Sequence, residues 1–297
     1  SIRRIFTAPR DDYTKHLVAA MPNILSPKMD VNPSQVGRPI LKLRNISLSY
    51  RNLHGKGMNK VLDDVSLDVY RGHVTALVGE SGSGKSTIAK AIMGIEPIES
   101  GTMELDDKEL VEERTLEERA KVQMVFQDPF SSLDQRYSVR RALSEIVRLH
   151  GGRTWRKDQV TERCCELLRD VRLGEDYLDA LPREMSGGQR QRLAIAKALA
   201  TNPRLLIADE ATSALDVSVQ AQIIDLFRTL SRSKNLGILF IAHDLAVVRD
   251  ISDWVYVIQH GRIVESGLTG AVFAHPRKPY TQELLDSIPG AKRRVGN

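Results

Sequence analysis

The stretch VTALVGESGSGKSTIAKAIMGI, residues Val74–Ile95, decides the fold of this 297-residue chain. Its first five residues, Val74–Val78, form an apolar run that is typical of a buried parallel strand. Residues Gly79–Ser86 then match the pattern G-x-x-x-x-G-K-[ST], and a helical pattern follows them. A strand, a glycine-rich loop and a helix in this order predict a phosphate-binding loop (P-loop) in an α/β fold.

The residue types of this loop suit a nucleotide. Glycines let backbone N–H groups turn inward around phosphates, and the positive end of the following helix adds to the attraction. We expect Lys85 to reach the β- and γ-phosphates and the Ser86 hydroxyl to bind Mg²⁺. The alternative is a chance turn rich in glycine and serine, but the flanking strand and helix favour a nucleotide site. The expected binding residues are Gly79, Ser81, Gly82, Ser83, Gly84, Lys85, Ser86 and Thr87.

A second predicted strand, RLLIADE at residues 204–210, ends in two carboxylates. Asp209 is placed to hold Mg²⁺, and Glu210 can polarise an attacking water as a general base. A pair of acids after a strand is often only a helix N-cap with a solvated neighbour. Together with the P-loop, the pair favours hydrolysis of the bound nucleotide.

The segment REMSGGQRQRLAIAKALATNP lies just before that strand. Ser186–Gln189 leads into a helical pattern over residues 190–200, so two glycines precede a helix start that can bind a second anion. The alternative is an ordinary capped helix. Because the P-loop already supplies a complete cradle, the functional interpretation is a phosphate clamp for a nucleotide bound by another copy of the domain.

The motifs GESGSGKST, MSGGQ, LLIADE, SALD and IAHD stand in the order and spacing of ATP-binding-cassette (ABC) ATPases, which this chain resembles over about residues 39–289. The resemblance implies an α/β fold of the ABC ATPase type. Such a fold has a P-loop NTPase (RecA-like) core, an antiparallel β layer and an inserted helical subdomain, here about residues 129–186. One departure is Met185 where the family has Leu, a change that conserves volume.

The resemblance also implies roles for single residues. Tyr50 would stack on the adenine; the alternative is a tyrosine that packs across its strand. Gln127 would contact Mg²⁺ and sense the membrane partner, and His243 would hold the γ-phosphate and position the attacking water. Asp216 would lie in the loop that joins two ATP sites. The residues that would close over ATP on the opposite subunit are Ser186, Gly187, Gly188 and Gln189.

The C-terminal tail VFAHPRKPYTQELLDSIP resembles the extension of ATPases that serve dipeptide, oligopeptide and nickel importers. It implies ATP-driven import, with peptides as the expected cargo and nickel, opines or other small solutes as alternatives. The implied partners are a second cassette, two transmembrane permease subunits and, indirectly, a periplasmic or extracellular solute-binding protein. The implied location is the cytoplasmic face of the bacterial plasma membrane. A soluble tandem cassette acting on the ribosome or on DNA is the alternative from a different class.

Composition adds limits on partners and metals. The net charge of +5 is mild, which indicates a solvated surface rather than a nucleic-acid footprint. The two cysteines, Cys164 and Cys165, are adjacent and lie in a helical pattern, which predicts buried or half-buried thiols. The tail lacks the clustered cysteines with which some relatives bind an iron–sulfur cluster, so no cluster is expected. The longest apolar run, Gly237–Ala242, is strand-sized.

The first residues resemble the last ones. Residues 5–22 and 272–289 share seven identities, at Phe6/Phe273, Pro9/Pro276, Arg10/Arg277, Tyr13/Tyr280, Thr14/Thr281, Leu17/Leu284 and Pro22/Pro289. We therefore expect residues 1–22 to be the tail of a preceding cassette, 23–39 a linker, 40–267 the ABC ATPase domain and 268–297 its extension. The alternative is an unrelated amphipathic helix with chance matches.

Overall fold

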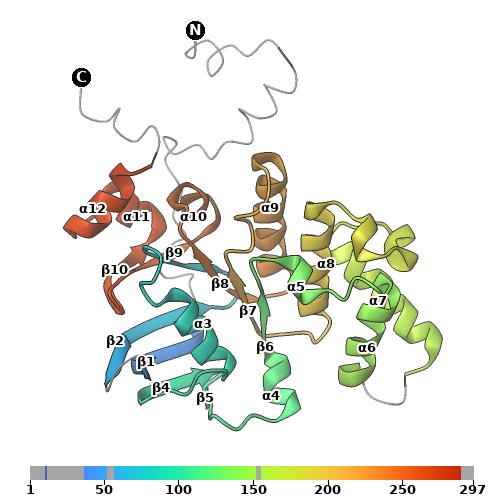
Figure 1. The fold of residues 1–297 in the computed structure, drawn as a ribbon, viewed down its shortest axis with the longest axis horizontal. Coiled ribbons are helices and arrows are strands. Elements are labelled where there is room, and N and C mark those ends of the chain that lie inside the picture. Colours follow the sequence, from blue (N-terminus) through green and yellow to red (C-terminus); the bar gives the residue numbers. More distant parts are fainter. Residues whose placement is uncertain (1–10, 12–36, 52–56, 152–154, 289–297) are drawn as a thin grey trace.

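The computed structural model describes residue 11 and residues 37–51, 57–151 and 155–288 (Figure 1). The predictions for the N-terminal repeat and for most of the linker therefore lie outside the described residues. Two β-sheets organise the described chain, one of four strands and one of six.

The four-stranded sheet is antiparallel, in the order β2-β1-β4-β5. Strand β1 (Pro39–Arg51) pairs with β2 (Met58–Tyr70) on one side and with β4 (Ser100–Leu105) on the other, which confirms the predicted antiparallel layer. Strand β4 and the short β5 (Lys108–Glu109) come after β3 in the chain but return to the antiparallel layer. They do so because Met103 and Leu105 of β4 are buried in the same cluster as β1.

The six-stranded sheet has the order β10-β9-β3-β8-β7-β6. Its parallel strands are β3 (Val74–Val78), β6 (Val122–Val125), β7 (Leu205–Asp209), β8 (Gly237–Ala242) and β9 (Trp254–Gln259). In its register Val78 lies opposite Ala242, and Asp209 lies opposite Ile241. The carboxyl ends of β3, β8 and β7 are therefore neighbours, and the P-loop, His243 and the two acids all follow them directly.

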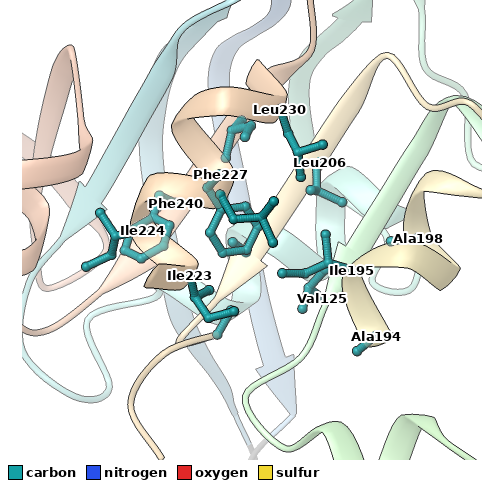
Figure 2. Packing of buried hydrophobic residues seen from close by; sticks show 14 of the residues in the cluster. Val125, Ala194, Ile195, Ala198, Leu206, Ile223, Ile224, Phe227, Leu230 and Phe240 are labelled. Atoms are coloured by element: carbon teal, nitrogen blue, oxygen red, sulfur yellow. The ribbon is translucent and has the colours of Figure 1, made fainter. Parts of the chain in front are cut away.

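Helices cover the two faces of this sheet. Helix α3 (Lys85–Met93) packs with the antiparallel layer on one face, in a cluster that includes Ile88, Leu77 and Ile207. Helices α8 (Gly187–Leu199), α9 (Val217–Ser233) and α10 (Leu245–Ile251) cover the other face. Figure 2 shows Phe227 of α9 beside Phe240 of the sheet, and their rings meet edge to face with centroids 6.0 Å apart. Helices α3 and α8 thus lie on opposite faces.

In the predicted helical subdomain the regular elements of the described residues are all helices or 3₁₀ turns, joined by short irregular segments. It holds α5 (Pro129–Ser132), α6 (Val139–Gly151) and α7 (Lys157–Asp170), followed by the 3₁₀ turns η2 (Glu175–Asp179) and η3 (Pro182–Glu184). Both cysteines lie in α7 as buried free thiols, as predicted. A further short helix, α4 (Leu116–Lys121), was not anticipated, and it begins with a capping box between Thr115 and Glu118.

The C-terminal part begins with a hairpin. Strand β10 (Arg262–Leu268) pairs antiparallel with β9, and the turn at His260 and Gly261 is left-handed, with φ of 48° and 74°. Helices α11 (Thr269–Ala274) and α12 (Pro279–Asp286) then lie beside α10 (Figure 1). Their apolar side chains, with that of Ile288, join the first core cluster, which is the one that contains Phe227 and Phe240. None of the described helices has the length and apolar character that crossing a bilayer requires.

Candidate functional site

The P-loop joins β3 to the N-terminus of α3. The structure shows no side-chain cap on this helix end and no acidic residue in its first turn, and the N-cap residue is Gly84 with φ of 107°. Gly82 also has a left-handed φ, of 79°. Backbone N–H groups at such an end need an external acceptor, and an anion supplies one. The local structure therefore favours phosphate at the place predicted from the sequence.

Lys85 is buried within the loop that it follows. Its Nζ donates to the carbonyl oxygens of Gly79 at 2.8 Å and Glu80 at 2.7 Å. Burial lowers the pKa of Lys85, while the nearby carboxylates of Glu210 and Asp209 act in the opposite direction. The ammonium group is thus held beside the acids of β7, within the cradle that a phosphate would enter.

Asp209 lies at the carboxyl end of β7. Its Oδ1 atom is buried and has no hydrogen-bond partner among the described residues. Burial raises the pKa of this carboxyl group, and a hydrogen bond from Ser86 partly offsets the rise. A buried carboxylate oxygen without a partner, beside a hydroxyl group, is an oxygen donor set of the kind that Mg²⁺ prefers. The residues present therefore fit the predicted metal.

Glu210 and His243 meet at the same edge. The Oε1 atom of Glu210 lies 3.2 Å from Nδ1 of His243. The Glu210 side chain is 26% exposed and that of His243 is 60% exposed, so water can reach both. Glu210 adopts a left-handed φ of 48°, and its N–H donates to the carbonyl oxygen of Ile241 at 2.9 Å. The predicted base and the predicted phosphate-sensing histidine thus form one pair.

Gln127 comes from the fourth neighbouring strand. It follows β6, which pairs with β7, and its side chain is exposed. The structure therefore presents Gln127 at the same sheet edge as Asp209 and Glu210.

The segment Ser186–Gln189 forms the start of α8. The Ser186 Oγ atom accepts from the Gln189 N–H at 3.3 Å, and the Gln189 Oε1 atom accepts from the Ser186 N–H at 2.7 Å. The Gln189 amide also donates to Oη of Tyr177 at 2.7 Å. A Cβ atom at Gly188 would lie 2.5 Å from Cγ1 of Val219, so only glycine fits there.

Asp216 caps the neighbouring helix α9. Its Oδ1 atom accepts from the Val219 N–H at 2.9 Å and from the Ser218 hydroxyl at 2.7 Å, and these bonds lower the pKa of Asp216. The contact of Gly188 with Val219 brings the starts of α8 and α9 together. Because α8 packs on the face opposite α3, Ser186–Gln189 does not belong to the cluster around Lys85.

Tyr50 lies near the end of β1, opposite Asn59 of β2. It is half-buried and packs against the second core cluster, which is the one that contains Leu77, Ile88 and Ile207. This placement gives the tyrosine the packing contact that we weighed as an alternative and leaves part of its surface exposed. Its contact with adenine stays a prediction.

Sequence reasoning missed one residue at the P-loop. Tyr280 of α12 accepts a hydrogen bond at its Oη atom from the backbone N–H of Glu80, at 3.0 Å. The repeat in the sequence singled out this tyrosine, but its pattern gave no indication of the partner.

Comparisons with known proteins agree with this geometry. Residues 62–213 match the ABC transporter family, and residues 264–296 match the oligopeptide/dipeptide transporter C-terminal region. The chain is 44% identical over 257 residues to the dipeptide transport ATP-binding protein DppF of Lactococcus lactis, covering 85% of this chain and 82% of that protein. It is 42% identical to the oligopeptide transport ATP-binding protein OppF of Streptococcus mutans, with the same coverage.

A longer relative and two solved structures extend the comparison. The glutathione import ATP-binding protein GsiA of Pectobacterium atrosepticum is 37% identical over 98% of this chain, which spans 51% of that protein. The fold is similar to cbiO1 of Clostridium perfringens, part of the ABC transporter complex cbiONQ, with a TM-score of 0.73, 28% identity and coverage of 85% and 97% of the two chains. It is also similar to the ATP-binding cassette MJ0796 in a dimeric, post-hydrolysis state bound to ADP and Pi, with a TM-score of 0.67, 26% identity and coverage of 77% and 98%.

Proposed function

Since the chain belongs to the ABC transporter family, we propose that it is the subunit that binds and hydrolyses ATP to power the import of peptides. The match of residues 264–296 to an oligopeptide/dipeptide transporter region favours peptides over nickel, opines or other small solutes. The relatives DppF and OppF, which are named for dipeptide and oligopeptide transport, support the same cargo class. They also favour transport over action on the ribosome or on DNA.

The observation that carries the proposal is the convergence of the P-loop, Asp209, Glu210 and His243 at neighbouring strand ends. The N–H groups of the P-loop and of α3 bind the phosphates of ATP, and Lys85 neutralises charge on the β- and γ-phosphates. Ser86, Asp209 and Gln127 would hold Mg²⁺, which neutralises further phosphate charge when it is bound.

Glu210 and His243 would then carry out hydrolysis. The Glu210 carboxylate accepts a proton from the attacking water, and oxygen of that water forms the new bond to the γ-phosphorus as the bond to ADP breaks. His243, 3.2 Å from Glu210, orients this carboxylate and contacts the γ-phosphate. The exposure of both side chains gives water its access.

A second cassette completes the proposed machine. Ser186–Gln189 begins a helix on the face opposite α3, so we assign it to the ATP held by a partner cassette, with Asp216 between the two sites. The dimeric state of the similar cassette MJ0796 supports this arrangement. The repeat at residues 5–22 and the length of GsiA favour a partner in the same polypeptide.

The proposed membrane partners are two permease subunits, with a solute-binding protein acting on them from the other side. The chain would lie as a peripheral subunit on the cytoplasmic face of the membrane. Phe126, beside Gln127, is 45% exposed, and we propose that it offers a permease subunit an apolar contact at the border of the ATP site.

The substitution Glu210→Gln tests the catalytic assignment. It removes the base but keeps the shape of the side chain, so we expect ATP hydrolysis to fall by at least about 100-fold while ATP affinity stays within about twofold. The variant should also form an ATP-bound dimer in size-exclusion chromatography. Glu117→Gln, an exposed position of α4, is the matched control and should behave as the wild type. Hydrolysis by Glu210→Gln at the wild-type rate would refute the assignment.

A reconstituted transporter tests the cargo. The chain, with its permease and binding-protein partners in vesicles, should hydrolyse ATP faster when di- or oligopeptides are added. Stimulation by nickel but not by peptides would contradict the proposed cargo and leave the ATPase assignment intact.

A further inference from the structure

We propose that Tyr280, in the C-terminal helix α12, is a positioning residue for ATP binding, because its hydroxyl fixes the peptide unit that holds Lys85. This inference rests on the proposed ATP-binding role of the P-loop. It assigns to the C-terminal extension a direct part in nucleotide affinity.

The argument begins with one peptide unit, the bond between Gly79 and Glu80. Its carbonyl oxygen, on Gly79, accepts from Nζ of Lys85 at 2.8 Å. Its N–H group, on Glu80, donates to Oη of Tyr280 at 3.0 Å. In a planar trans peptide these two groups point in opposite directions. Lys85 therefore holds the inner side of the unit, and Tyr280 holds its outer side.

Each bond supports the other. Donation by the N–H group polarises the peptide and makes its carbonyl oxygen a better acceptor for the Lys85 ammonium group. Without the phenol oxygen, the Glu80 N–H group would lose its protein partner in a partly buried setting, which has a cost in free energy. Rotation of the peptide away from the orientation in which it accepts from Lys85 would then lower the free energy, because the N–H group could find another acceptor.

The rest of the outer side of the P-loop is braced by the same part of the chain. The Gly261 N–H group, in the β9–β10 turn, donates to the Ser83 carbonyl oxygen at 3.0 Å. A Cβ atom at Gly79 would overlap the carbonyl oxygen of Ile258, in β9, so only glycine allows this close approach. Ile258, Gly261 and Tyr280 thus line the outer side of the loop.

Tyr280 is itself firmly held. Its side chain is 8% exposed within the first core cluster, and burial raises the pKa of the phenol, so the hydroxyl is neutral at pH 7. The start of α12 is tied to β10, because the Glu265 carboxylate accepts from the backbone N–H groups of Arg277 at 2.8 Å and Lys278 at 3.2 Å. The hydroxyl can therefore act as a fixed point for the P-loop.

The test compares two tyrosines in the full chain. Tyr280→Phe removes only the hydroxyl at the P-loop. Tyr256→Phe is the matched control, because Oη of Tyr256 accepts from the Asp68 N–H group, also at 3.0 Å, and its side chain is 7% exposed. The two variants lose the same kind of bond, one at the P-loop and one away from it.

We expect the Kd for Mg·ATP, measured by calorimetry, to rise about fivefold in Tyr280→Phe, the loss of about one ordinary hydrogen bond. The KM for ATP should rise in parallel, whereas kcat should stay within about twofold, because bound phosphates then hold Lys85 themselves. Tyr256→Phe should lower the melting temperature without changing Kd. Glu265→Gln, which weakens the anchor of α12, should raise Kd by a smaller factor.

An unchanged Kd in both Tyr280→Phe and Glu265→Gln would overturn the inference. An equal rise in Tyr280→Phe and Tyr256→Phe would overturn it too, since the effect would then be a general loss of stability. If Tyr280→Phe does not fold, Glu265→Gln decides by the same criterion. Failure of the wild-type chain to bind Mg·ATP would instead refute the proposed function.

Discussion

Two helix N-termini in this molecule differ in whether side chains of the protein accept from their N–H groups. At α3, Gly84 caps the helix without a side-chain hydrogen bond, and no acid lies in the first turn of the described helix. At α8, Ser186 and Gln189 form a complete capping box, and Tyr177 accepts a further bond from Gln189. One end lacks acceptors for its N–H groups, whereas the other supplies its own.

The difference indicates how the two ends would meet phosphate. The α3 end would bind it without breaking a side-chain cap hydrogen bond, so on this proposal a single chain would suffice for ATP binding. At the α8 end a phosphate must compete with the Ser186 hydroxyl for the Gln189 N–H group. We therefore propose that binding at α8 would be weaker alone and would depend on a partner cassette that already holds ATP.

The substitution with the largest expected effect on this comparison lies at the α3 end. Lys85→Ala removes the cation that meets the β- and γ-phosphates, and ATP affinity should fall by more than about 100-fold. Calorimetry with Mg·ATP measures it. Lys90→Ala, at an exposed position of the same helix, is the matched control and should retain affinity within about twofold. Undiminished affinity in Lys85→Ala would refute the assigned cradle.

A smaller effect should follow at the α8 end. Ser186→Ala removes the cap, which costs about 1 kcal/mol of stability, and should slow steady-state hydrolysis about tenfold while leaving the ATP affinity of the single chain unchanged. Thr115→Ala removes the same kind of cap from α4 and should cost similar stability without slowing hydrolysis. If Ser186→Ala weakens ATP binding as strongly as Lys85→Ala does, the two ends do not differ as proposed.

The smallest effect concerns stability without nucleotide or Mg²⁺. Burial raises the pKa of Asp209 above its unfolded value, so its ionised form costs stability as pH rises through the folded pKa. Asp209→Asn should therefore raise the melting temperature by about 1 to 3 °C at pH 7.5, and by less at pH 4.5. Asp134→Asn should show the opposite sign, because hydrogen bonds from Arg136 lower the pKa of Asp134 to about 2. Thermal unfolding at both pH values tests the pair of signs.

Much of this arrangement followed from sequence because each motif is short and local. A strand, Gly79–Ser86 and a helix carry their own chemistry, and the parallel strands bring Asp209 and His243 to the same edge.

The rest depended on contacts that no local pattern encodes. Tyr280 and Glu80 are separated by 200 residues in the chain. The position of Tyr280 in an amphipathic tail predicts only a packing residue of the core. The return of β4 to the antiparallel layer depended on a free edge of β1, which is a tertiary property. Tyr50 stayed ambiguous because one aromatic ring can serve both a core and a base.

The register of β3, β8 and β7 has a consequence for how the length of this chain can vary. Asp209 lies opposite Ile241, and Val78 lies opposite Ala242. The relative positions of the site residues therefore depend on the number of residues in each of the paired strands. Deleting a single residue from β7 would displace its acids by about 3.3 Å or, if the acids kept their place, would turn the side chains before the deletion to the opposite face. Natural insertions and deletions should therefore be absent from these three strands and gather in the connections far from their carboxyl ends.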